Sequence, residues 1–295
     1  MKFVKGGNVS RLLEGISIPK MFHAKQAFDD AKITPEDIPA VVYRELSKPG
    51  IGETIKPGMT VAVTAGSRGV ANVNVITRAI VDFCKEKGAH PFIVPAMGSH
   101  GGALAEGQKE LLAGYDITEE SMGCPIKSSM ETVLLGYSQY GKPVYQDKYA
   151  HEADGIIISC RIKPHNAFRG PYESGVCKMM VVGLGKQMGA ESVHSDGLGN
   201  MARNLPANAR VALDRSNILF AIPCVENAYD ETSIIEAIPR EAIMDREPEL
   251  LKTAFSNMPG ILVGEADVLI VNEIGKNFSG TGVDPNISGT WSTEF

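Results

Sequence analysis

The 295-residue sequence lacks any apolar run long enough to cross a membrane, because its longest apolar stretches have the length of single strands. A membrane-spanning helix needs about 20 predominantly apolar residues. The first seven residues also lack the apolar core of a secretory signal. We therefore expect a cytoplasmic protein without a membrane segment.

Cysteine is scarce, and the five residues form no Cys-X-X-Cys pair. This spacing excludes a zinc ribbon and a thioredoxin-like redox motif, so we expect reduced thiols. Positive charge is also in slight deficit, with 29 Lys and Arg against 35 Asp and Glu and a net charge of −6. Proteins that bind nucleic acid rely on clustered Lys and Arg, so the composition argues against a nucleic-acid partner.

The common nucleotide-binding and metalloprotease motifs are missing as well. No Gly-X-Gly-X-X-Gly or P-loop motif follows an apolar run, and no His-Glu-X-X-His occurs. Dinucleotide-binding and P-loop functions therefore lose support. Glycine, in contrast, is abundant: its 31 residues have no collagen-like period and gather in short loops.

From about residue 59, short apolar runs alternate with segments of helical periodicity. Strands are predicted at Thr60–Thr64, Phe92–Pro95, Gly155–Cys160, Ile218–Pro223 and Val268–Val271, with a hairpin around Val133–Tyr145. Helices are predicted around residues 35–46, 103–113, 146–153, 202–213 and 248–255, and through Ile76, Ile80 and Phe83 to about Gly88. This alternation predicts an α/β fold, a mostly parallel sheet flanked by helices in a Rossmann-like lobe.

Two loops that follow predicted strands carry histidine, at the edge where open α/β sheets place their ligand sites. Glycines flank His100, which lets backbone approach a ligand, although a turn with a solvated histidine is the alternative. Cationic residues surround His165 within Arg161–Gly170, which favours a neutral imidazole that accepts a proton. Arginine there is also suited to binding a carboxylate, and an exposed basic loop is the alternative.

A third segment, Tyr172–Ser195, holds a lysine and a histidine of interest. Lys178 lies in an apolar run, where desolvation favours a neutral, nucleophilic amine, although a structural lysine is the commoner outcome. His194 ends a predicted helix and is either a metal ligand or a helix-capping residue. Upstream, Arg68 follows the first predicted strand, a position that suits anion binding.

Taken in order, four motifs resemble those of the nickel-dependent lactate racemase family: Gly98-Ser-His-Gly-Gly102, Lys163-Pro-His-Asn-Ala-Phe-Arg-Gly170, Gly175-Val-Cys-Lys178 and Val193-His-Ser195. The resemblance covers about Thr60 to Gly282. It implies a nickel-pincer nucleotide, a pyridinium-derived cofactor tethered to a lysine, with nickel held by cofactor atoms and one histidine. It also implies that a hydride leaves the carbinol carbon of a 2-hydroxy acid and returns on the other face.

Residue by residue, the resemblance assigns Lys178 to the tether and His194 to nickel. It matches His100 and His165 to the two histidines that exchange the hydroxyl proton, and Arg68 to the arginine that holds the substrate carboxylate. Two such histidines make chemical sense, because the hydroxyl must lose its proton as the hydride leaves, from either face. The implied partners are a small 2-hydroxy acid and the proteins that synthesise the cofactor.

The sequence departs from the family pattern on the substrate side. Lactate racemases usually carry aspartate and proline where this chain has Ala65 and Gly69, and their downstream substrate lysine has only Lys276 as a nearby candidate. We therefore expect an isomerase, a racemase or epimerase of a 2-hydroxy acid other than lactate. Two alternatives stay open: a zinc-dependent hydrolase or lyase that uses the same three histidines, and a non-catalytic or cofactor-carrying module that binds an acidic metabolite.

The last residues suggest how the chain is divided. A polar, glycine-rich loop at Gly275–Asn286 is followed by no helix or strand signal, and such loops ordinarily lie between elements. Members of the family are longer and have a second α/β lobe. We therefore expect a cofactor-binding lobe over residues 1–264 and, over residues 265–295, the beginning of a truncated second lobe.

Overall fold

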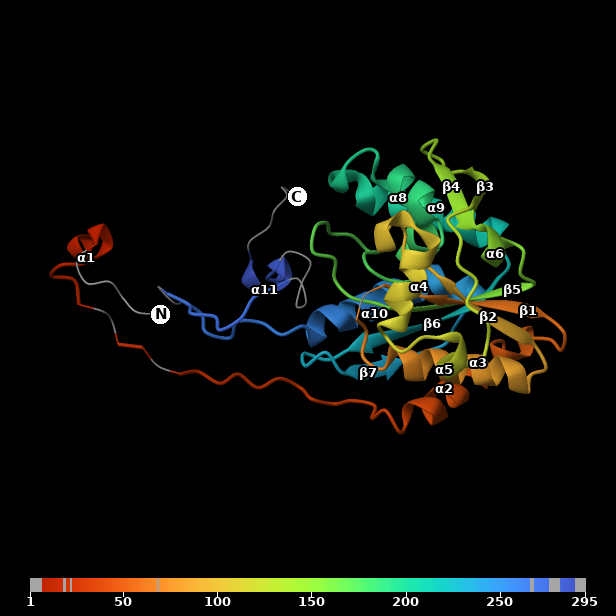
Figure 1. Ribbon diagram of the computed structural model, residues 1–295, viewed down its shortest axis with the longest axis horizontal. Helices are drawn as coiled ribbons and strands as arrows, with labels where there is room; N and C mark the ends of the chain where they lie inside the picture. The colour runs from red at the N-terminus through yellow and green to blue at the C-terminus, as the bar shows by residue number, and fades with distance from the viewer. Residues whose placement is uncertain are drawn as a thin grey trace.

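The computed structural model describes residues 7–17, 20–21, 23–67, 69–265, 268–275 and 282–289. Its described strands build a six-stranded sheet and a separate two-stranded hairpin. Figure 1 shows the sheet at the centre of a folded body, with helices on both sides and the N-terminal segment extending away from it. The expected division at residue 264 stays a prediction.

Four parallel strands form the centre of the sheet in the order β2-β1-β5-β6. They are β1 (Thr60–Ala65), β2 (His90–Pro95), β5 (Gly155–Arg161) and β6 (Ile218–Glu226). Two short strands pair antiparallel with β6, namely β7 (Thr232–Ile235) and β8 (Ile238–Pro239). The prediction of a mostly parallel sheet is confirmed. The parallel strands read as near-continuous apolar runs because both faces are covered.

Each face of the sheet packs against its own set of helices. One face is covered by α2 (Ile38–Leu46) and α3 (Val73–Glu86), whose buried residues recur at helical spacing. The other face is covered by α7 (Val176–Lys178), α8 (Lys186–His194), α9 (Met201–Arg215) and α10 (Ile243–Asn257). The shorter elements are α1 (Asn8–Leu12), α4 (Ala105–Ala113), α5 (Glu119–Met122), α6 (Lys148–His151), α11 (Pro285–Ser288), and the hairpin strands β3 (Thr132–Tyr137) and β4 (Pro143–Asp147).

Two predicted elements differ from the structure. The helix expected over residues 146–153 is the single turn α6, because Gln146 and Asp147 complete β4 and the Asp147 side chain caps the turn by accepting from the Ala150 N–H at 2.9 Å. The strand expected at Val268–Val271 is irregular, and its four side chains are 55–65% exposed. An apolar run forms a stable strand only where a neighbouring strand pairs with it.

The topology opens a crevice at the carboxyl edge of the sheet. From β1 the chain passes to β2 on one side, whereas β5 and β6 lie on the other, so the winding direction changes between β1 and β5. Open α/β sheets bind ligands at such a point. Within the described part of the chain, no helix combines the length and apolar character that a bilayer crossing requires.

Candidate active site

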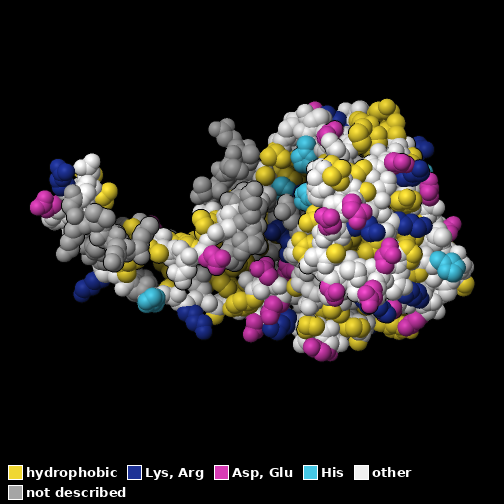
Figure 2. All heavy atoms as spheres, in the orientation of Figure 1, with side chains coloured by type: hydrophobic (Ala, Val, Ile, Leu, Met, Phe, Trp, Pro, Cys, Tyr) yellow, Lys and Arg dark blue, Asp and Glu magenta, His cyan; other side chains and the backbone are white. Residues whose placement is uncertain are grey.

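A cavity of about 830 Å³ lies at this carboxyl edge, where loops after β1, β2 and β5 converge. Its lining includes Ser67, His100, His165 and Lys178. Three of the predicted site residues therefore share one cavity, although 65 positions separate the two histidines in the sequence. Figure 2 shows histidine side chains on the flank of the folded body that faces α11.

His100 is held by the loop that follows β2. Its Nδ1 forms a short hydrogen bond with the Ser67 hydroxyl, which comes from the loop after β1. The Tyr115 hydroxyl donates to the Ser67 carbonyl at 2.8 Å and thereby fixes the position of that loop. Ser67 was not among the sequence candidates, and only the folding of two strand ends side by side brings it to His100.

His165 is a neutral imidazole of defined tautomer. Its Nδ1 accepts the backbone N–H of Ala167 at 3.0 Å, so the ring proton resides on Nε2. Burial first, then the positive charges of Lys178 and nearby groups, lowers the pKa of His165 to about 2. This shift agrees in direction with the predicted neutral state, but its first cause is burial rather than the cationic neighbours, and the ring in this tautomer donates from Nε2.

Glu173 organises the loop that carries His165. This carboxylate is 1% exposed and accepts the backbone N–H of His165 at 2.6 Å and of Gly170 at 3.1 Å. Arg169 donates to the His165 carbonyl at 2.6 Å and pairs with Glu173 at 3.1 Å. The ring of His165 also lies 4.4 Å from that of Phe168, measured between centroids. The loop therefore presents a fixed imidazole.

Lys178 ends the short helix α7, which continues into a π-helical turn, η3 (Met179–Gly183). Such wide turns are rare in proteins, and those that occur often lie at functional sites. The side chain of Lys178 lines the cavity, whereas the preceding residues Val176 and Cys177 are buried. Burial raises the pKa of the Cys177 thiol well above its ordinary value, which makes this cysteine unreactive.

A second buried carboxylate, Glu247 of α10, holds the start of α7. Its Oε2 accepts the backbone N–H of Cys177 at 2.8 Å, while its Oε1 has no hydrogen-bond partner within the described residues. A side chain at Gly175 would place Cβ 2.2 Å from that Oε1, so glycine is required for this close approach. No sequence pattern singles out Glu247, because an isolated glutamate in an amphipathic helix ordinarily faces solvent.

His194, at the end of α8, is half-buried and lies near His165. Its Nδ1 lies 2.7 Å from the Ala190 carbonyl and must donate to it, which leaves the lone pair of Nε2 available for a metal. The same bond satisfies a carbonyl near the helix end, so the capping role also holds. Among the described residues, no three His, Cys, Asp or Glu side chains are arranged to hold a metal ion.

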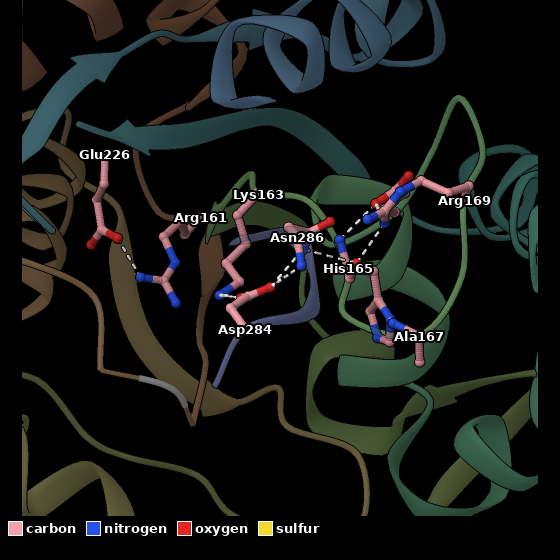
Figure 3. Close-up of polar contacts among 9 residues, drawn as sticks. Arg161, Lys163, His165, Ala167, Arg169, Glu226, Asp284 and Asn286 are labelled. Atoms are coloured by element: carbon pink, nitrogen blue, oxygen red, sulfur yellow. Dashed lines mark hydrogen bonds and ion pairs between the residues drawn. The ribbon is translucent and has the colours of Figure 1, made fainter. Parts of the chain in front are cut away.

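The cationic residues at the end of β5 and in the loop after it have acidic partners (Figure 3). Arg161 pairs closely with Glu226 at the end of β6. The Lys163 ammonium lies 3.9 Å from the Asp284 carboxylate, just before α11. Asn286 of α11 donates to the His165 carbonyl at 3.3 Å. The segment around α11 thus packs on the His165 loop.

Two predicted substrate residues, Arg68 and Lys276, lie outside the described residues. Their assignments therefore stay predictions. The neighbouring departures can be described: Ala65 is buried at the end of β1, and Gly69 lines the cavity. Ala65 and Gly69 both line the cavity, so neither position gives this part of the wall a polar side chain.

Comparison with known proteins is consistent with this architecture. The family model named "Lactate racemase N-terminal domain" matches residues 20–204. Among solved structures, the lactate racemase apoprotein from Thermoanaerobacterium thermosaccharolyticum is similar, with a TM-score of 0.56 and 18% sequence identity over 75% of this chain. The match covers 55% of that chain, so the present chain spans little more than half its length. No curated protein matches.

The likeness to the solved structure shows the shared α/β fold. The family match covers more than half of the sequence. All four motifs lie within its range, residues 20–204. The chain therefore belongs to the lactate racemase N-terminal domain family.

Proposed function

We propose that the protein is a racemase or epimerase of a 2-hydroxy acid other than lactate, and that it acts with a nickel-pincer nucleotide bound to Lys178. The observation that carries this proposal is the convergence of His100, His165 and Lys178 on one cavity. Family membership supports an isomerase in general terms. The acid–base pair and the anchoring amine are the features of this chain that point to the specific reaction.

The residues present fit the proposed cofactor. A cavity of about 830 Å³ lies within the usual range of roughly 300–1,000 Å³ for small-molecule and cofactor sites. Lys178 would hold the cofactor covalently, and the unprotonated Nε2 of His194 would contribute one nickel ligand. When bound, the cofactor supplies a reversible hydride acceptor.

The two histidines would handle the hydroxyl proton. His100 accepts it at Nε2 when its Nδ1 donates to Ser67, the tautomer in which Nε2 is unprotonated. His165 carries its proton on Nε2 and would donate a hydrogen bond from it to the substrate oxygen; it returns a proton only after a second proton has made the ring an imidazolium. For the opposite enantiomer the roles exchange, and His165 must then change tautomer and release the Ala167 N–H. The two directions of the reaction therefore make different demands on the two loops.

The substrate side is proposed with Arg68 as the carboxylate-binding residue and Lys276 as a second cation. The apolar Ala65 and the glycine at position 69 replace the residues that lactate racemases usually carry, which supports a substrate other than lactate. We further propose that cofactor-synthesis proteins act as partners in the cytoplasm. A second lobe beginning in residues 265–295 would complete the cavity, in keeping with the greater length of the similar solved structure.

The first test is covalent loading. We expect the protein produced together with cofactor-synthesis enzymes to show an added mass on intact-mass analysis, and the adduct to be absent from Lys178→Ala. Lys163→Ala, which removes another lysine of the same cavity, should retain the adduct and serves as the matched control. An adduct that persists in Lys178→Ala would show that the tether is assigned to the wrong residue.

The second test is turnover. Loaded protein should interconvert the enantiomers or epimers of at least one 2-hydroxy acid, followed by chiral chromatography. His100→Gln and His165→Gln should each lower kcat by about 10²- to 10⁴-fold, the usual contribution of general acid–base catalysis. A loaded protein that binds hydroxy acids but inverts none would favour the non-catalytic, cofactor-carrying alternative over the racemase.

A further inference from the structure

A fully buried lysine, Lys186, lies at the start of α8 and outside the cavity lining. Its ammonium donates to the Pro95 carbonyl at the end of β2 and to the Gln108 side-chain oxygen, the latter at 3.1 Å. It also faces the buried Asp147 carboxylate at 3.2 Å. A buried charge is costly unless it is paired and hydrogen-bonded, and these three groups surround this one.

Gln108 connects Lys186 to the loop after β2 that carries His100, called here the His100 loop. Its side chain is fully buried, and its Nε2 donates to the carbonyls of Gly98 at 2.9 Å and His100 at 3.2 Å. Both amide protons and the amide oxygen are therefore engaged, with Lys186 on one side and the loop on the other. An amide held on both sides fixes the loop more firmly than a single bond would.

The same loop packs against the turn that carries Lys178. The Gly98 N–H donates to the Gly183 carbonyl of η3 at 3.2 Å. A side chain at Gly183 would lie 2.8 Å from the Ala96 carbonyl, so the two backbones touch. Lys186 follows η3 by three residues and has a left-handed backbone (φ +54°), which is uncommon outside glycine. The backbone therefore turns sharply at Lys186, whose ammonium contacts Pro95 and Gln108 beside the His100 loop.

We propose that Lys186 and Gln108 are positioning residues that hold the His100 loop in register with the Lys178 turn. Neither residue touches the cavity, and both act through the backbone of the loop. The proposal rests on the proposed function in that His100 is taken as an acid–base group. It adds two residues to the machinery of that reaction and gives a role to a charged side chain that lies fully buried.

The decisive variant is Gln108→Glu. It preserves the side-chain shape and an oxygen for Lys186, but it replaces the amide donor with a carboxylate oxygen that faces two carbonyls. The loop should therefore move while the Lys186 contact remains. The matched control is Gln146→Glu, the same change at a glutamine that is also buried, whose Nε2 donates to the Ser216 hydroxyl at 2.9 Å.

The first readout needs neither cofactor nor substrate. Imidazole nitrogen NMR signals of His100, assigned by their loss in His100→Gln, should shift or broaden in Gln108→Glu because the Ser67 contact loosens. They should stay in place in Gln146→Glu. Unchanged His100 signals in Gln108→Glu, or equal changes in both variants, would overturn the proposal. If Gln108→Glu does not fold, Gln108→Leu, which removes the same donor without adding charge, is measured in its place.

The second readout uses loaded enzyme. Gln108→Glu should lower kcat by about 10- to 100-fold with little change in KM, since small displacements of a catalytic group have effects of this size. A kcat equal to that of the wild type would count against the positioning role. A wild-type enzyme that inverts no hydroxy acid would instead contradict the proposed function, and the NMR result would still decide whether Gln108 positions His100.

Discussion

Glu247→Gln is expected to remove a pH dependence of stability that originates beside the Lys178 helix. Burial raises the pKa of Glu247 from its ordinary 4.5 to about 7, and the N–H of Cys177 offsets only part of that rise. The folded protein therefore binds the Glu247 proton more tightly than the unfolded chain does. Between these two pKa values stability falls as pH rises, because deprotonation is easier in the unfolded state.

The size of the effect follows from the same two values. At about 1.4 kcal/mol per pH unit, the gap between 4.5 and about 7 corresponds to about 3 kcal/mol. This stability is present in full below pH 4.5 and is lost as pH rises through 7. Glutamine stays neutral and retains an acceptor for the Cys177 N–H. The stability of Glu247→Gln relative to wild type should therefore increase by about 3 kcal/mol between pH 5 and pH 8.

The assay is urea unfolding of both proteins at several pH values, with the difference in unfolding free energy plotted against pH. All other titrating groups are common to both proteins and largely cancel in the difference. The control is Glu249→Gln on the same helix, an exposed carboxylate paired with Lys252, which should show no such rise. A difference that stays flat from pH 5 to pH 8 would refute the reasoning, since it would mean that the charged carboxylate is not penalised by burial.

Two further predictions concern the segment between His165 and the Lys178 helix, at Gly175 and at Glu173. Gly175→Ala should lower the unfolding free energy by about 1–3 kcal/mol, because its Cβ would lie 2.2 Å from Glu247 Oε1. A denaturant midpoint as little changed as that of Gly199→Ala, where no atom lies within 4 Å, would contradict it. Glu173→Gln leaves one acceptor for two backbone N–H groups, so the His165 amide should exchange its hydrogen about tenfold faster. Unaltered exchange at this amide would show that the glutamate does not hold the loop.

Much of the fold follows from local patterns in the sequence. The runs at β1, β2, β5 and β6 are apolar over nearly their whole length, and the structure buries them as parallel strands. The helix α3 was predicted from residues spaced at i, i+4 and i+7, and these positions are buried. The apolar run at residues 268–271 has the same local signal, but none of the described strands pairs with it. Pairing is a tertiary property, and no local pattern reports it.

The candidate site was predictable only in part. Motifs with glycine, histidine and lysine after strand ends pointed to His100, His165 and Lys178, because the ends of parallel strands meet at one edge. Glu247 and Lys186 could not be found in this way. Glu247 meets Cys177 across 70 positions, and Lys186 meets Pro95 across 91. A charged residue in a helix is ordinarily solvated, and only the packing of distant segments buries these two.

The sequence by itself determined the α/β class, the positions of the main strands and helices, and the motifs by which the family is recognised. These features depend on side-chain periodicity and on residue types within short segments, which act locally. The tertiary structure decided which nitrogen of His165 carries its proton, which hydroxyl meets His100, and which carboxylate holds the Lys178 helix. Each of these depends on a hydrogen bond or on burial set by the three-dimensional packing, and their energies therefore exist only in the folded chain.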